Sequence, residues 1–208
     1  MPALQQRSLF DIGDPDVLSP LAGLTRTPLA GDAWIDLLPG WLSGAGELFD
    51  RLAGSVPWKA ERRQMYDGVV AVPRLLKFYD AGEPLPDPVM AECFDALNAH
   101  YSAADGGPFA SAGLCLYRDG RDSVAWHGDR IGRGATHDTM VAILSVGAPR
   151  PLCLRPLGGR EELRFRLGHG DLIVMGGSCQ RTWEHAIPKT ARVVGPRISI
   201  QFRPVGVR

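Results

Sequence analysis

The sequence predicts a single α+β domain that is mainly β, built as an antiparallel sandwich or jelly roll with helices toward its N-terminus. The chain has 208 residues, enough for one substantial core and too few for two. Gly (25) and Pro (17) are both abundant, which favours a turn-rich β architecture over a helical bundle. Strand-like runs crowd the second half of the chain, whereas helical periodicity is confined to the first half.

In the first half, residues 1 to about 33 are irregular and polar, and we expect an extended arm there. A short helix is expected to begin near Ser43 and to run through Leu52. The clearest helix begins at Asp87-Pro88, where an N-cap residue precedes proline at the first helical position. Its apolar stripe recurs every three or four residues, at Met90, Phe94, Leu97 and Tyr101.

In the second half, short strands with turn residues between them follow the break at Asp105-Gly106-Gly107-Pro108. We expect one structural unit, with an N-terminal arm and helix at 1–55 and the main domain at 56–208, whose core spans about 109–206. Strands packed this densely are typical of an antiparallel sandwich or jelly roll. The candidate strands are 111–118, 122–128, 138–147, 150–155, 161–167, 171–176, 182–188 and 196–204.

Composition and charge exclude several classes of protein. The formal net charge is zero, so binding of a polyanion would need a local basic patch. No apolar run approaches the roughly 20 residues that span a bilayer, and the N-terminus shows no secretory signal. The four cysteines are scattered without a CxxC pair, which favours reduced thiols. We therefore expect a monomeric cytoplasmic protein with no membrane partner.

The motif His127-Gly128-Asp129 supplies two candidate metal ligands. Residues i and i+2 of a strand point to the same face, so this imidazole and carboxylate can aim at one point. A distant His185, brought alongside by a sheet, would complete a face of two histidines and one carboxylate. That ligand set leaves coordination positions open, and it suits a non-haem Fe(II) that must bind both a co-substrate and dioxygen. We expect His137, ten residues beyond His127, to be a loop histidine.

Two arginines lie downstream of these ligands in one strand-like run. Arg203 follows Arg197 by six positions, an even number, so in a strand both guanidinium groups lie on one face. Bidentate pairing by such groups suits a dicarboxylate ligand.

These residues fall within blocks that resemble the AlkB family of Fe(II)- and 2-oxoglutarate-dependent dioxygenases, especially its bacterial members. The resemblance covers nearly the entire second half, and Met65-Tyr66 and Pro73-Arg74 resemble the family's nucleotide-recognition region more weakly. Several blocks in the family's order are far more specific than one His-x-Asp motif. The blocks are 116–129, which contains Trp126-His127-Gly128-Asp129, then 143–150, 168–177, 180–189 and the strand ending at Phe202-Arg203.

The resemblance implies a double-stranded β-helix that holds Fe(II) and uses 2-oxoglutarate and O2 as co-substrates. In such an enzyme the keto acid is oxidised to succinate and CO2, and an N-methyl group is hydroxylated and leaves as formaldehyde. The implied metal ligands are His127, Asp129 and His185. Arg197 is implied to bind the distal carboxylate of 2-oxoglutarate, and Arg203 the carboxylate beside the keto group, with Tyr117 also in the co-substrate site.

Three positions depart from the family pattern. Cys115 stands where members usually have asparagine, two residues before the tyrosine, and a thiol is a weak hydrogen-bonding group. Ser199 and Gln201 replace the asparagine and threonine of the last motif, so we expect Cys115 and Ser199 to form a rearranged co-substrate site. Ile131 occupies the place of an acidic residue that commonly faces the damaged base, which leaves the exact lesion open.

The expected partner is alkylated single-stranded DNA or RNA. Candidate contacts with the base are Met65, Tyr66, Arg74, Trp126 and Ile131, and candidate phosphate contacts are Arg62, Arg63, Arg74 and Lys77. Two alternatives stay open at this stage. In one, the same oxygenase chemistry acts on a protein side chain or small molecule. In the other, the chain is a non-enzymatic β-sandwich that binds nucleic acid.

Overall fold

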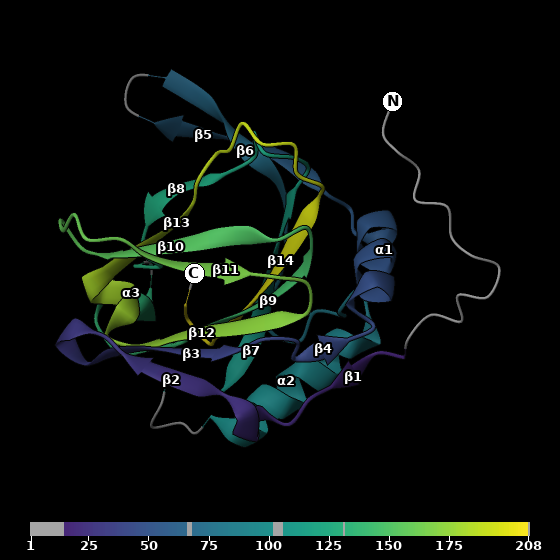
Figure 1. The fold of residues 1–208 in the computed structure, drawn as a ribbon, viewed down its shortest axis with the longest axis horizontal. Coiled ribbons are helices and arrows are strands. Elements are labelled where there is room, and N and C mark those ends of the chain that lie inside the picture. Colours follow the sequence, from purple (N-terminus) through teal and green to yellow (C-terminus); the bar gives the residue numbers. More distant parts are fainter. Residues whose placement is uncertain (1–14, 66–67, 102–105, 131, 208) are drawn as a thin grey trace.

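The computed structural model describes residues 15–65, 68–101, 106–130 and 132–207. Its framework is two antiparallel sheets packed face to face, with α1 and α2 on the outer side of the larger sheet (Figure 1). The larger sheet has eight strands in the order β2-β3-β12-β9-β14-β7-β6-β5, and the smaller has four in the order β11-β10-β13-β8. The mainly β, two-sheet architecture expected from the sequence is confirmed.

The strands follow the order of the chain only in part, which brings distant segments together. The larger sheet consists of β2 (Thr25–Pro28), β3 (Ala33–Leu38), β5 (Lys59–Met65), β6 (Gly68–Tyr79), β7 (Phe109–Tyr117), β9 (Val141–Gly147), β12 (Asp171–Gly177) and β14 (Arg197–Pro204). The smaller sheet consists of β8 (Val124–His127), β10 (Arg150–Pro156), β11 (Leu163–Leu167) and β13 (Trp183–Ile187). A short ribbon joins β1 (Val17–Leu18) to β4 (Leu42–Ser43).

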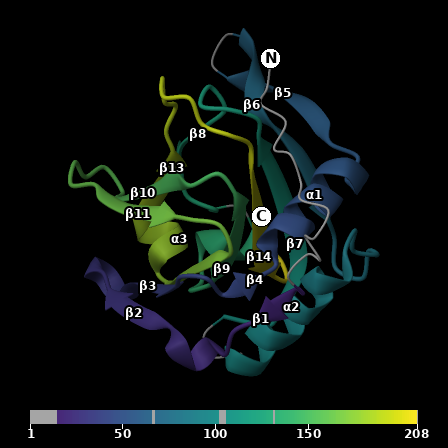
Figure 2. The same ribbon diagram turned by 45° about the vertical axis from the view of Figure 1, so that its right-hand side comes forward.

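In the described part of the chain the two longer helices, α1 and α2, lie on one side of the molecule and α3 lies on the other (Figure 2). The helices are α1 (Ala45–Ser55), α2 (Pro88–His100), α3 (Cys179–Thr182) and the 3-10 turns η1 (Leu21–Gly23), η2 (Ala30–Asp32) and η4 (Arg133–Ala135). The expected start of α2 is confirmed: Asp87 is its N-cap, and the carboxylate accepts a 3.0 Å hydrogen bond from the backbone N–H of Val89. Pro88 occupies the first helical position, where its missing N–H costs nothing.

The alternation of side chains along β14 divides the interior into two layers. Ile198, Ile200 and Phe202 pack beneath α1 and α2 in one apolar cluster. The polar residues that alternate with them point instead into the space between the sheets and line a cavity there. They are Arg197, Ser199, Gln201 and Arg203. The alternation of side chains along β14 therefore puts apolar residues into the core beneath the helices and polar residues into the cavity between the sheets.

All eight strands expected in the second half are present, with ends that differ by up to three residues. The first half differs more. Residues 25–28 form β2 rather than part of an irregular arm, and all four are exposed, so this edge strand carries no apolar alternation for the sequence to reveal. Ser43 lies in β4, and α1 begins later because Gly44, with φ of 68°, occupies the N-cap in a left-handed conformation.

Two further findings concern the chain as a whole. Its four cysteines are free and buried. Within the described residues, no helix has both the length and the apolar character needed to cross a membrane.

Candidate active site

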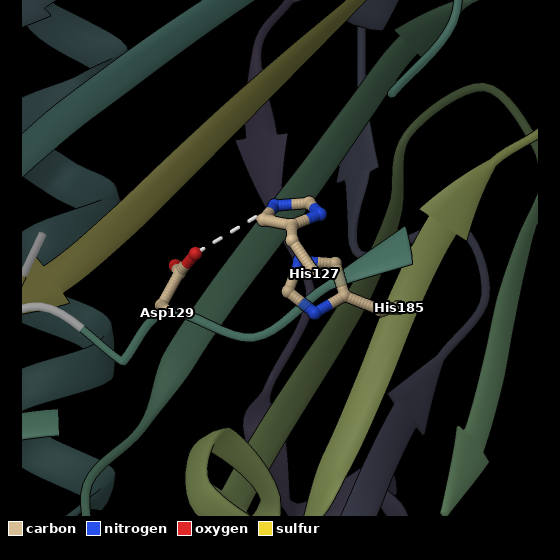
Figure 3. Close-up of side chains that lie close together, drawn as sticks. All are labelled: His127, Asp129 and His185. Atoms are coloured by element: carbon tan, nitrogen blue, oxygen red, sulfur yellow. Dashed lines mark ion pairs between the residues drawn. The ribbon is translucent and has the colours of Figure 1, made fainter. Parts of the chain in front are cut away.

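The three candidate metal ligands meet in the space between the sheets (Figure 3). His127 ends β8, and His185 lies directly opposite it in β13, so antiparallel pairing sets the two imidazoles 4.2 Å apart between ring centroids. Asp129 follows β8, and its Oδ1 lies 3.7 Å from Nε2 of His127. One ligand atom from each residue lies within 4.8 Å of the others. An ion with bonds of about 2.0–2.2 Å to N and O holds its ligands at most about 4.4 Å apart, so this group is slightly wider than a loaded site.

Gly128 makes the tight spacing between the two ligands possible. A Cβ at this position would lie 2.7 Å from the backbone carbonyl oxygen of Gln180 and 3.1 Å from that of Trp183. The chain therefore passes too close to α3 and β13 for any side chain to fit without displacement. A glycine here lets His127 and Asp129 converge beside His185.

Each histidine has a ring nitrogen close to the other two candidate ligands. Nδ1 of His127 lies 2.8 Å from the carbonyl oxygen of Ala125, so Nδ1 donates there and Nε2 is the nitrogen left to bind a metal. Burial, together with the neighbouring His127, lowers the pKa of His185 to about 3, and the carboxylate of Asp129 opposes this shift only in part. His185 is therefore uncharged at neutral pH, the form that binds metals.

Asp129 is buried, yet it is held in the ionised form. Burial by itself would raise the pKa of this carboxyl, but the charge of Arg203 and the hydrogen bond from it, together with the nearby imidazole rings, hold the pKa well below its usual range. Nε of Arg203 donates to Oδ2 of Asp129 at 2.9 Å. The backbone N–H of Asp129 donates to Oε1 of Gln180 at 3.2 Å, which fixes the loop. A carboxylate and two imidazoles form a donor set that fits Fe(II).

The structure places both arginines of β14 in the same cavity, on the face expected from their spacing. Arg197 is only 1% exposed, and its Nε donates to Oγ of Ser145 at 2.8 Å. Nη1 of Arg197 is buried without a hydrogen-bond partner. Its guanidinium lies 5.4 Å from the ring centroid of Tyr117. A buried arginine nitrogen without a partner is costly, so this end of the cavity fits an anionic ligand such as a carboxylate.

Gln201, one of the departures from the family pattern, joins the polar residues of the cavity into a chain. Its Oε1 accepts from Nη2 of Arg203 at 2.6 Å. Its Nε2 donates to Sγ of Cys115 and to Oγ of Ser199, each at 3.4 Å. Cys115 and Ser199 also line the cavity, so the structure brings both of them to the candidate co-substrate site.

The cavity is large, about 1110 Å³, and it extends beyond the histidines and arginines to β6. Trp126 and Arg74 both line it. Arg74 does not point outward, as a contact for the phosphate backbone would: its Nη1 donates to the carbonyl oxygen of Ser123 at 3.1 Å. Tyr66 and Ile131 lie outside the described residues, as does the side chain of Met65.

Other candidates are placed away from the metal ligands. His137 is exposed, and its Nδ1 contacts Oγ1 of Thr136 at 2.8 Å; it is not part of the ligand group. Lys77 lines the cavity but pairs with Glu83 at 2.9 Å.

Gln180 and Ser145 were missed by sequence reasoning, because their partners lie 51 and 52 residues away along the chain.

Comparison with known proteins agrees with this geometry. Residues 36–203 match the 2OG-Fe(II) oxygenase superfamily. The chain is 31% identical over 198 residues to "Alpha-ketoglutarate-dependent dioxygenase alkB homolog 3" of Bos taurus, covering 84% of this chain and 67% of that protein. It is 32% identical over 143 residues to "DNA oxidative demethylase ALKBH2" of Arabidopsis thaliana, covering 57% of this chain and 44% of the relative.

Solved structures share the fold. OsALKBH1 matches with a TM-score of 0.59 at 14% identity, over 81% of this chain and 97% of that one. A prolyl hydroxylase of Trichoplax adhaerens matches with a TM-score of 0.55 at 12% identity, over 81% and 83% of the two chains. The jelly-roll fold is confirmed, and the non-enzymatic alternative is set aside. The chain therefore belongs to the AlkB family, and it is a dioxygenase that uses Fe(II), 2-oxoglutarate and O2.

Proposed function

We propose that this enzyme oxidatively demethylates N-alkylated bases in single-stranded DNA or RNA. The observation that carries the proposal is the cavity, whose volume of about 1110 Å³ exceeds what one small co-substrate fills. The candidate metal ligands and both arginines of β14 line one part of it, and β6 lines another. The cavity thus offers room for a base next to the metal. The relative named as a DNA oxidative demethylase supports the same substrate class.

In this proposal His127, Asp129 and His185 hold the iron. Bound Fe(II) supplies the activation of O2, coupled to oxidation of 2-oxoglutarate. The protein would contribute two imidazoles and one carboxylate, a set of three ligands that would leave room on the metal for the co-substrate and O2. Arg203 and Gln180 hold Asp129 in place, and the carbonyl of Ala125 orients His127.

Arg197 and Arg203 are proposed to bind the two carboxylates of 2-oxoglutarate. Arg197, with Nη1 free of any hydrogen-bond partner, receives the distal carboxylate, and Arg203, beside Asp129, receives the one next to the keto group. Burial raises the pKa of Tyr117, so its phenol stays protonated and can donate to the co-substrate. Ser199 and Cys115 complete this proposed site, with Gln201 linking them.

The overall reaction conserves atoms. One oxygen atom of O2 enters succinate as the keto acid loses CO2, and the other becomes the hydroxyl of an N-hydroxymethyl group. The C–N bond then breaks, formaldehyde leaves, and the base nitrogen recovers a proton. A base stacked in a duplex cannot reach the metal, so the nucleotide enters unpaired or flipped, at a cost of a few kcal/mol.

Trp126 is proposed to form one wall for that base. Its ring is half-buried and lines the cavity, and the guanidinium of Arg155 lies 4.2 Å from the ring centroid. Glu184 binds Arg155 at 3.0 Å and so holds the guanidinium against the indole of Trp126. Arg74 is proposed to act inside the cavity on the base, and Met65, Tyr66 and Ile131 remain proposed base contacts.

The proposal is tested with a panel of single-stranded DNA and RNA oligonucleotides that carry different N-methylated bases. We expect loss of the methyl group from at least one base, with formaldehyde and succinate released in equal amounts. The variant His185→Ala, which lacks one proposed metal ligand, should be inactive on the same oligonucleotides. Succinate release with no base repaired would indicate a protein or small-molecule substrate instead.

A further inference from the structure

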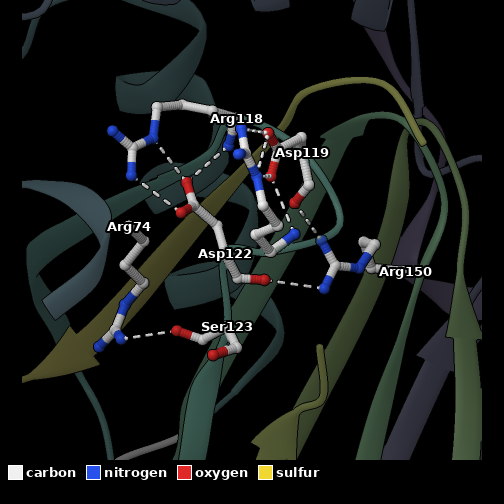
Figure 4. A network of polar contacts seen from close by, with 7 residues as sticks. Arg74, Arg118, Asp119, Asp122, Ser123 and Arg150 are labelled. Carbon is white, nitrogen blue, oxygen red and sulfur yellow. Dashed lines mark hydrogen bonds and ion pairs between the residues drawn. The ribbon is translucent and has the colours of Figure 1, made fainter. Parts of the chain in front are cut away.

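A buried arginine outside the proposed metal and co-substrate sites ties together two loops beside the cavity. Arg150, the first residue of β10, is only 1% exposed. Its Nη1 donates to the carbonyl oxygen of Asp119 at 3.0 Å (Figure 4). Its Nη2 donates to the carbonyl oxygens of Asp122 at 2.9 Å and Pro188 at 2.7 Å. One guanidinium therefore joins the loop after β7 to the loop after β13.

The charge of Arg150 is held without any carboxylate against it. In the described part of the chain, the side chains of Asp119 and Asp122 bind Arg121 and Arg118 instead, and only their carbonyls reach Arg150 (Figure 4). Burying a guanidinium against neutral acceptors is expensive, and apolar side chains would pack there at lower cost. An arginine at this buried site is explained if its role is to fix the loop after β7 and the loop after β13 relative to each other.

Both loops continue directly into the wall of the cavity. Ser123 follows Asp122, Lys189 follows Pro188, and both line the cavity. The loops are also joined directly, because the backbone N–H of Thr190 donates to the carbonyl oxygen of Gly120 at 2.8 Å. Arg150 thus sets where the backbone of Lys189 lies relative to the cavity.

Lys189 is the cation of this wall that best fits a ligand from solution. It is exposed, and no ion pair joins it to a carboxylate in the described residues, whereas Lys77 pairs with Glu83 and Arg203 with Asp129. An ammonium on a flexible stem acts as a point charge for phosphate. When a base enters a cavity, its phosphates stay at the rim, where such a charge can reach them.

We propose that Lys189 binds a backbone phosphate of the strand whose base enters the cavity, and that Arg150 is the positioning residue that fixes the Lys189 loop. This inference rests on the proposed nucleic-acid substrate. It adds a phosphate contact at the wall of the cavity, within the loop between β13 and β14. The contact is with the backbone, so it serves every base sequence equally.

The test is the salt dependence of oligonucleotide binding to the full chain loaded with Mn(II) and 2-oxoglutarate. Each phosphate contact on a single strand adds about 0.7 to the slope of log affinity against log salt concentration. Lys189→Gln should therefore make the salt dependence less steep, reducing the magnitude of the slope by about 0.7. The reduction should be the same for oligonucleotides of different sequence. The matched control is Arg166→Gln, which removes one exposed positive charge on β11 away from the cavity and should leave the slope unchanged.

Arg150→Met tests the positioning role, with circular dichroism to verify folding. We expect this variant to lose the same increment of slope, and the double variant with Lys189→Gln to lose no more than Arg150→Met alone. A wild-type slope in Lys189→Gln would overturn the phosphate contact, even if Arg150→Met fails to fold. A full additional loss in the double variant would overturn the role of Arg150. If the wild-type protein binds no oligonucleotide, the proposed function itself fails.

Discussion

Arg197 and Arg203 share one face of β14 but have different neighbours. Arg203 donates to Asp129, whereas Arg197 donates to Ser145 and leaves Nη1 without a partner. Both substitutions to alanine should weaken 2-oxoglutarate binding, by about 2–5 kcal/mol if a carboxylate is left buried and unpaired. Only Arg203→Ala should also weaken metal binding, by about 10–100-fold, because it removes the group that holds a proposed ligand.

Calorimetric titration separates the two effects. Mn(II) is titrated first into protein alone, and 2-oxoglutarate is then titrated into the Mn(II)-loaded protein. Arg166→Ala, at an exposed position on β11, is the control for loss of one positive charge. Equal Mn(II) affinity in the Arg197→Ala and Arg203→Ala variants would show that the Arg203–Asp129 contact does not support the metal.

At the scale of single elements, the N-cap residue of α2 both caps the helix and joins it to α1. Asp87 caps the helix through Val89, and it also binds Nε of Arg51, from α1, at 2.6 Å. We expect Asp87→Ala to lower the free energy of unfolding by about 0.5–2 kcal/mol through the lost cap. The lost partner of Arg51 adds to that loss, although Arg51 is 41% exposed and solvent screening keeps the addition small.

Urea denaturation followed by circular dichroism measures this change. Asp95→Ala, on the exposed side of the same helix, removes an equal charge without touching the cap and should change stability little. If the two variants were equally stable, the cap would contribute nothing beyond its charge. Catalytic constants of Asp87→Ala should stay near those of the wild type, because α2 packs on the face of the larger sheet away from the cavity.

The whole molecule should be stabilised by a dicarboxylate more than by a monocarboxylate. The interior holds Arg197 without a carboxylate partner in the described residues, so a bound co-substrate supplies the missing charge. At 100 times its dissociation constant, a ligand that binds only the folded state adds about 2.7 kcal/mol. For a chain of this size that is a rise in Tm on the order of 5–10 °C.

Thermal unfolding is followed with Mn(II) and either 2-oxoglutarate or pyruvate at the same concentration. Pyruvate has the keto acid group but no distal carboxylate, so its shift in Tm should be much smaller. The difference between the two acids should vanish in Arg197→Ala, which cannot bind the distal carboxylate. Equal shifts in the wild-type protein would place the distal carboxylate elsewhere.

Local sequence patterns determined much of this protein. The Asp87-Pro88 signal located α2, and alternation with turn residues located the eight strands of the second half. The same period of two placed Arg197 and Arg203 on one face. These features depend on backbone geometry over a few residues, and a sequence records that geometry directly.

The tertiary structure decided what the local pattern does not contain. Strand order set His185 opposite His127, and it brought Gln180 to Asp129 and Gln201 to Cys115. It also recruited the exposed segment 25–28 as an edge strand and turned Arg74 inward. Contacts between residues far apart in the chain depend on which strands pair and how the sheets pack. The hydrophobic periodicity and the secondary-structure propensity of a segment do not specify that pairing.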